Sequence, residues 1–201
     1  DSPQARAFLD APWELLAHDG QHWSLREEII FCPVRRVGKA VEPPPPSPYR
    51  LSVVFMAAAP RGAENLKYEA EEAAILEATR DLGLDLVVEE SGTLGLLSAC
   101  VARERPDVVH ISCHGRLAPE PGLLLEDDFG DPAFVKTSQL VSKLAYHHPR
   151  LLFLSACETA ESNPVLDSLA RALVRSGVPG VLGWAARVRD AEATIFASRL
   201  Y

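Results

Sequence analysis

No apolar run in this 201-residue chain approaches the roughly 20 residues that a helix needs to cross a lipid bilayer. The opening stretch, DSPQARAFLD, also lacks the basic and apolar regions of a secretory signal, so we expect a cytoplasmic protein that does not enter a membrane. The glycine-containing stretch SGTLG (91–95) has neither the Rossmann nor the Walker spacing of a phosphate loop. These absences argue against a membrane protein and against a nucleotide-binding site.

Basic residues are few as well, with 20 Lys and Arg against 28 Asp and Glu and a net charge of −8. Binding of nucleic acid or of an anionic membrane surface needs clustered positive charge, which this sequence does not have. The four cysteines, Cys32, Cys100, Cys113 and Cys157, show no CxxC spacing and are expected to be reduced thiols rather than disulfide or zinc ligands. We expect no metal or organic cofactor, and we place Cys32, Cys100 and Cys113 in the core.

The proline-rich stretch EPPPPSPYR (42–50) is expected to interrupt regular secondary structure, because consecutive prolines are excluded from helix interiors and sheet ladders. We therefore predict a short segment over 1–41, a proline-rich linker over 42–49 and a main domain over 50–201. The dipeptide Asp19-Gly20 predicts a tight β-hairpin in the first segment, which 27–37 could extend. Such a small ribbon is expected to pack on the main domain, since it cannot fold stably alone.

The main domain alternates short apolar stretches with amphipathic ones, which is typical of a parallel sheet with helices on both faces. We predict strands over 50–59, 84–90, 107–113, 150–156 and 178–184, and helices over 64–83, 93–105, 138–147, 163–177 and from 189 onward. A loop with a small β excursion at 122–127 is expected between 116 and 137.

Three details of these helices are also predicted. In the helix over 64–83, Leu66, Ala70, Ala73, Ala74 and Leu76 are expected to face the core, with Ile75 off that face and the charged side exposed. Thr93 and Asn163 are placed to cap the two helices that follow them.

Reactive side chains end two of the predicted strands. The stretch HISCHG (110–115) ends with His114 and Gly115, and LSACETA (154–160) contains Cys157. If these strands are neighbours, their ends lie about 5 Å apart. An imidazole at that distance can take the thiol proton and stabilise the thiolate, so His114 is the candidate base and Cys157 the candidate nucleophile.

The order of these motifs resembles the CHAT domain, a caspase-like cysteine peptidase family of clan CD that is often associated with tetratricopeptide repeats. The similarity rests on PWELL (12–16), PRGAENLKYEAEEAAIL (60–76), DVVHISCHG (107–115), GLLLED (122–127), LLFLSACETA (151–160) and the stretch 169–201. It implies an α/β caspase-haemoglobinase fold, a catalytic dyad of His114 and Cys157, and an oxyanion hole formed by the backbone amides of Gly115 and Cys157.

The resemblance carries further expectations. Domains of this family continue through a long helix, so the present chain is expected to be truncated at its C-terminus. A bacterial parent protein, control by a sensor or repeat region elsewhere in it, and a protein substrate such as a partner effector are also implied. In the substrate pocket for the P1 side chain, Ser155 offers no counter-ion to a basic residue, and Arg61 lies where caspases bind an acidic one. An acidic or neutral P1 residue is therefore favoured.

Two other functions remain open at this stage. The first is a non-catalytic interaction module, in which His114 and Cys157 are present but the domain scaffolds a complex. Taken alone, a cysteine at a strand end is more often a small buried hydrophobic residue than a nucleophile. A flavodoxin-like nucleotide-binding domain would share the strand pattern, although the missing phosphate loop argues against it. Cleavage that depends on Cys157 would separate the peptidase from the first alternative, and ligand-dependent thermal stabilisation would identify the second.

Overall fold

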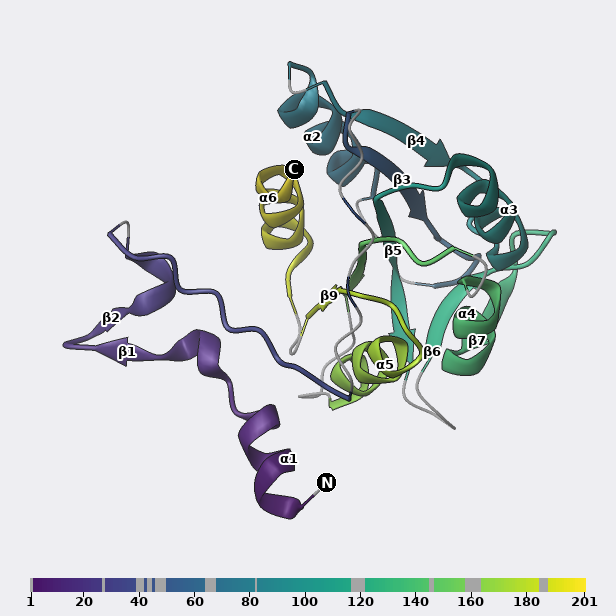
Figure 1. Cartoon of the computed structure of the whole chain (residues 1–201). Helices are drawn as coiled ribbons and strands as arrows, with labels where there is room; N and C mark the ends of the chain where they lie inside the picture. Colours follow the sequence, from purple (N-terminus) through teal and green to yellow (C-terminus); the bar gives the residue numbers. More distant parts are fainter. Residues whose placement is uncertain are drawn as a thin grey trace. The chain divides into compact units, whose positions relative to one another are not determined.

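The computed structural model describes the chain except for residues 1, 27, 39–41, 43, 44, 46–49, 64–67, 82, 117–121, 145, 146, 158–163 and 185–187. Most of the predicted proline-rich linker and the proposed cap Asn163 thus lie outside the described residues. The chain divides into two units, Asp1–Val37 and Gly38–Tyr201, and Figure 1 shows the elements of each.

The first unit consists of short elements around a two-stranded ribbon. It contains α1 (Pro3–Asp10), two 3-10 turns (Trp13–Leu15 and Trp23–Leu25), β1 (Ala17–His18) and β2 (Gln21–His22). The strands pair antiparallel through Asp19 (φ 52°) and Gly20 (φ 74°), the positive values that a type I′ turn requires, so the predicted hairpin is confirmed. The proposed extension of the ribbon is wrong, because the described residues 28–37 form no strand. Helix α1 was not predicted.

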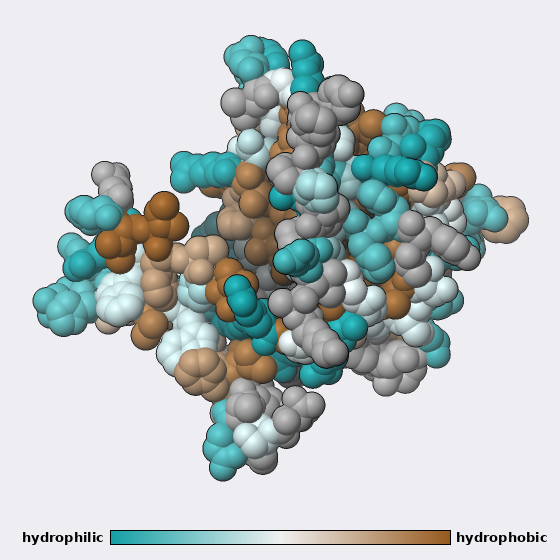
Figure 2. Space-filling view, in the orientation of Figure 1, coloured by the Kyte–Doolittle hydropathy of each residue, from teal (hydrophilic) through white to brown (hydrophobic). Residues whose placement is uncertain are grey.

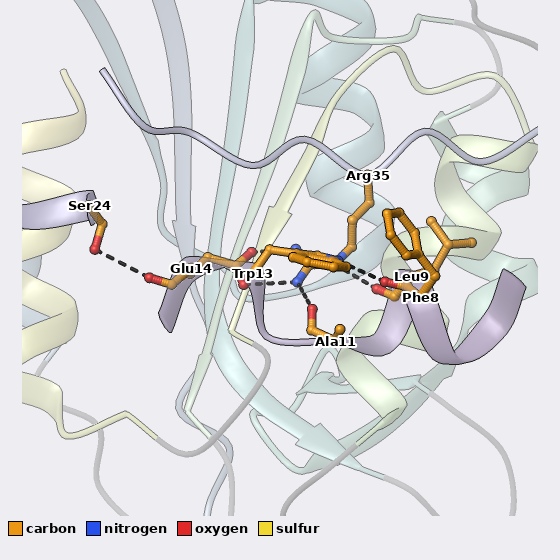
Figure 3. Close-up of polar contacts among 7 residues, drawn as sticks. All are labelled: Phe8, Leu9, Ala11, Trp13, Glu14, Ser24 and Arg35. Carbon is orange, nitrogen blue, oxygen red and sulfur yellow. Dashed lines mark hydrogen bonds and ion pairs between the residues drawn. The ribbon is translucent and has the colours of Figure 1, made fainter. Parts of the chain in front are cut away.

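Arg35 holds the first unit together (Figure 3). Its Nε donates to the carbonyl oxygen of Leu9 (2.8 Å), and its Nη2 donates to that of Ala11 (2.9 Å). The guanidinium also donates a hydrogen bond to each carboxylate oxygen of Glu14. The hydrogen bond from Arg35 lowers the pKa of the Glu14 carboxyl. Because a guanidinium presents its donors in a fixed fork, one side chain fixes the end of α1 and the turn that follows it.

Replacing Arg35 with alanine is expected to loosen this unit selectively. The loss of a charged donor that makes several hydrogen bonds corresponds to about 1.5 to 3 kcal/mol, and none of the described side chains in 2–37 is fully buried to compensate for it. Limited proteolysis should then cut within residues 1–37 faster, while the main unit keeps its melting temperature. Arg36→Ala, at an exposed neighbouring position, is the control, and equal protection in all three proteins would contradict the prediction.

Large apolar side chains remain exposed on the first unit, and Figure 2 draws such residues in brown. They include Phe8, Leu15, Leu25, Ile30 and Val34. The unit therefore buries little apolar surface within itself.

A mostly parallel sheet forms the main unit. Its parallel strands are β3 (Ser52–Ala57), β4 (Asp85–Glu89), β5 (Val108–Arg116), β8 (Leu151–Cys157) and β9 (Val181–Gly183), and they run in the order β4-β3-β5-β8-β9. The antiparallel strands β6 (Gly122–Glu126) and β7 (Pro132–Lys136) complete the seven strands that the described residues contribute to this sheet. All five predicted strands are present, and the expected β excursion is the β6–β7 hairpin.

Helices cover both faces of this sheet (Figure 1). On one face, Ile75 of α2 (Tyr68–Thr79) and Ala197 of α6 (Asp190–Leu200) pack with Phe55 and Phe153. On the other face, α3 (Leu94–Glu104), α4 (Thr137–Leu144) and α5 (Pro164–Arg175) bury their apolar residues. Thr93 caps α3 as expected, since its Oγ1 accepts the amide hydrogen of Leu96. No helix among the described residues has the length and apolarity to span a bilayer.

Two predictions of burial are wrong. The buried residues of α2 are Glu71, Ile75 and Thr79, spaced at i, i+4 and i+8, whereas Leu76 is 46% exposed. The sheet surface beneath α2 carries polar groups, so the helix turns a glutamate rather than its alanines toward it. Cys32 is exposed and not in the core, while Cys100 and Cys113 are buried as expected.

Candidate functional site

The ends of β5 and β8 form the candidate site. The two strands pair in parallel from Val108 and Leu151 to His114 and Cys157, and these last two residues are register partners. The two strands are therefore neighbours, which is the condition on which the candidate dyad depended. Neighbouring strands lie about 4.8 Å apart, so the chain brings the imidazole-bearing and the thiol-bearing residue to adjacent positions.

The end of strand β5 that carries His114 extends beyond its neighbour β3. The pairing of β3 with β5 stops at Ser112, and from His114 to Arg116 the same edge of β5 pairs with β6, with His114 opposite Leu124 and Gly115 opposite Leu123. His114, which is half-buried, thus lies between β6 and β8. Backbone pairing on both sides fixes its position in the sheet.

Alternation along the two strands separates the core side chains from the site. Val109, Ile111 and Cys113 belong to the large core cluster on one face of β5, so His110, Ser112 and His114 belong to the opposite face. Along β8, Leu152, Leu154 and Ala156 belong to the same large core. Phe153, Ser155 and Cys157 are the alternate positions of that strand.

The predicted P1 residues lie in different settings. Ser155 is 2% exposed, and its Oγ donates to Oε1 of Glu71 (2.9 Å). Arg61 follows β3 with a side chain 74% exposed, and its Nη1 lies 3.6 Å from Oδ1 of Asp131. The backbone N–H of Arg61 also donates to the carbonyl of Gly130 (3.0 Å), which ties this loop to the β6–β7 turn. A P1 pocket formed by Ser155 and Arg61 stays a prediction.

A buried polar cluster lies beside the strand ends. Glu71 is 4% exposed, and its Oε2 accepts a hydrogen bond from Ser112 Oγ (2.7 Å) in addition to the one from Ser155. His110, which is fully buried, places Nε2 at 3.5 Å from Oε1 of Glu71. Burial alone would raise the pKa of the Glu71 carboxyl, but the His110 ring and the two serine hydroxyls outweigh it and lower that pKa. These contacts therefore favour the ionised form of the Glu71 carboxyl.

The sequence profile of the CHAT domain matches residues 2–201, which is nearly the whole chain. The chain belongs to the CHAT domain family. This family is a caspase-like peptidase family, and the mostly parallel sheet with helices on both faces agrees with the α/β caspase-like fold that the resemblance implied.

Solved structures give weaker likenesses to this CHAT domain. One is a signal receiver domain described as that of the response regulator NarL from Mycobacterium tuberculosis, at 13% identity and a TM-score of 0.38, covering 76% of this chain and 98% of that one. Another is the Drosophila initiator caspase Dronc, at 11% identity and a TM-score of 0.34, covering 60% of this chain and 61% of that one. At these scores the likenesses add nothing to the family assignment. A search of curated proteins finds no match.

The polar cluster of the CHAT domain is the feature that the sequence analysis missed. The signal was nevertheless present, because Ser112 and Ser155 interrupt two mostly apolar stretches, each two positions before a reactive residue. Ile75, which was predicted to lie off the core face of the helix, is one turn from Glu71 and belongs to the buried side of α2. Among the described residues, no group of three or more His, Cys, Asp or Glu side chains is arranged to hold a metal ion.

Proposed function

We propose that this CHAT domain is a cysteine endopeptidase in which Cys157 is the nucleophile and His114 the general base and acid. The observation that supports this best is the register pairing of the two residues at the ends of adjacent parallel strands. A thiol needs a neighbouring base to attack as a thiolate, and adjacent strand ends place the two groups within reach of each other.

The reaction then follows from these positions. His114 takes the proton of Cys157, whose sulfur attacks the carbonyl carbon of the peptide bond, and the resulting oxyanion accepts hydrogen bonds from the amides of Gly115 and Cys157. Each such donor contributes about 3 to 4 kcal/mol in known acyl-transfer enzymes. His114 next gives its proton to the leaving amine as the C–N bond breaks. Water, activated by His114, hydrolyses the thioester and regenerates the thiol.

The proposed substrate is a protein, such as a partner effector, and a sensor or repeat region of a bacterial, cytoplasmic parent protein would control the activity. An acidic or neutral P1 residue remains the proposal. Ser155 donates inward to Glu71, and Arg61 already pairs with Asp131. A neutral P1 side chain fits these contacts better than an acidic one.

Cleavage assays with Cys157→Ala test this function. Wild-type protein is incubated with candidate partner proteins and with a fluorogenic peptide library varied at P1, and the products are identified by mass spectrometry. We expect Cys157→Ala to abolish cleavage, because it removes the proposed nucleophile that forms the thioester. Cys32→Ala, which removes an exposed thiol of the first unit, should cleave normally. Unchanged cleavage by Cys157→Ala, or none by the wild type under every activating condition, would refute the peptidase and favour an interaction module.

A further inference from the structure

A single carboxylate joins the two strands that carry the proposed dyad. Glu71 of α2 accepts one hydrogen bond from Ser112 of β5 and one from Ser155 of β8, each at a different oxygen. The two serines are register partners, as His114 and Cys157 are, and each precedes its dyad residue by two positions. Glu71 therefore bridges β5 and β8 directly before the strand ends that form the site.

The bridge lies where two of the other strand pairings in the sheet end. The pairing of β3 with β5 stops at Ser112, and the described pairing of β8 with β9 stops at Leu154. Beyond Leu154, the pairing of β8 within the described part of the chain is with β5 alone. A contact that fixes Ser155 against Ser112 at this point controls how the last residues of the two strands lie relative to each other.

Stability alone does not account for the carboxylate. Burying an ion is costly, and well-packed apolar residues in its place are often at least as stabilising. An apolar residue can be buried on this face of α2, because Ile75, one turn after Glu71, is completely buried. Two residues along a strand span about 7 Å, so Glu71 acts on the dyad through the strands and not by touching the substrate.

We infer that Glu71 is a positioning residue of the proposed peptidase, whose bridge between Ser112 and Ser155 holds His114 and Cys157 in the geometry for thiolate formation and attack. This inference rests on the proposed function. It gives α2, which contributes no residue to the dyad, a defined part in assembling the site.

Two substitutions of Glu71 separate the bridge from the packing. Glu71→Met keeps the bulk of the side chain but removes both acceptors, whereas Glu71→Gln keeps an amide that can bond to both serine hydroxyls. Because small displacements of reacting groups cost about 100-fold, we expect Glu71→Met to lower kcat by about that factor with KM nearly unchanged, and Glu71→Gln to restore most of the activity.

Thr79→Val is the matched control on the same helix. Thr79 is 5% exposed on the same face of α2, but its hydroxyl donates within the helix to the carbonyl of Ile75 (2.7 Å). We expect this variant to keep the wild-type kcat. If Glu71→Met does not fold, the double variant Ser112→Ala/Ser155→Ala removes the bridge while keeping Glu71, and it should show the same loss of kcat.

Alkylation of Cys157 provides a readout that needs no substrate. It is measured in a Cys32→Ala background, because Cys100 and Cys113 are buried, and peptide mapping assigns the label to Cys157. The rate of labelling at neutral pH should fall in Glu71→Met and recover in Glu71→Gln. Wild-type kcat and labelling in Glu71→Met, or an equal loss in Thr79→Val or Glu71→Gln, would overturn the inference. The proposed function fails separately, if Cys157→Ala still cleaves or the wild type never does.

Discussion

Replacing His114 with alanine is expected to lower kcat for peptide cleavage by about 10²- to 10⁴-fold, the range that a positioned general acid and base contributes. The variant loses the group that accepts the thiol proton of Cys157 and later protonates the leaving amine. Since His114 is held in β5 by backbone pairing with both β6 and β8, its side chain can be removed without removing the strand contacts. The measurement is kcat and KM on the peptide that the wild type cleaves best.

His147→Ala is the control for this experiment. The Nε2 of His147 lies 3.2 Å from the carbonyl oxygen of Pro106, which precedes β5, so this imidazole is at the other end of the strand from the dyad. We expect its removal to leave kcat unchanged. Added imidazole should restore part of the activity of His114→Ala, because free imidazole can diffuse into the site and act as the base that the side chain no longer supplies. A His114→Ala variant with wild-type kcat would show that another residue is the base.

The strands that carry the candidate dyad could be predicted because apolar patterning reveals where each strand begins and ends. Their adjacency was a condition of the prediction, and the resemblance to the CHAT domain supplied the pairing of His114 with Cys157. LLFLSAC and DVVHISC are compact buried runs, and parallel strands end at the same edge of a sheet. Thr93 and the Asp19-Gly20 turn were predicted for a similar reason, since their local backbone requirements restrict the residue types that fit.

The bridge beneath the dyad could not be predicted from the same patterning. Hydrophobic periodicity assigns a glutamate to the solvent side of a helix. It also assigns Ile75 to a face from the apolar residues along the helix, without information about the sheet surface against which the helix packs. Only the tertiary structure shows that Ser112 and Ser155 provide two donors at one place. Cys32 was misplaced by the converse assumption, that a free cysteine is buried by default, although the first unit buries none of its described side chains completely.

The β6–β7 hairpin connects the stability of the domain to the position of His114. Strand β6 pairs with the part of β5 that extends beyond β3, and His114 is the first residue of that pairing, opposite Leu124. The same hairpin begins at Gly122, which pairs with Arg116 on one side and Lys136 on the other. A defect at Gly122 should therefore affect both folding and catalysis.

Gly122→Ala is expected to destabilise the main unit by about 3 kcal/mol, the upper end of the range for overpacked sites. A Cβ added at Gly122 would lie 2.3 Å from the carbonyl oxygen of Val135 and 2.7 Å from Cζ of Phe134. The backbone contact cannot be relieved by a side-chain rotation, so β6 must move away from β7. For a domain of this size the loss corresponds to a fall in melting temperature of about 6 to 12 °C.

Gly95→Ala separates this steric effect from the general effect of removing a glycine. Gly95 lies in α3, where an added Cβ meets nothing within 4 Å, and alanine is favoured over glycine in a helix by about 0.5 to 1 kcal/mol. Its melting temperature should rise slightly while that of Gly122→Ala falls, as measured by circular dichroism. Because Gly122→Ala shifts the strand that holds His114, its kcat should also fall at temperatures where it is still folded. Equal melting temperatures for the two variants would show that the hairpin accommodates the extra carbon without moving.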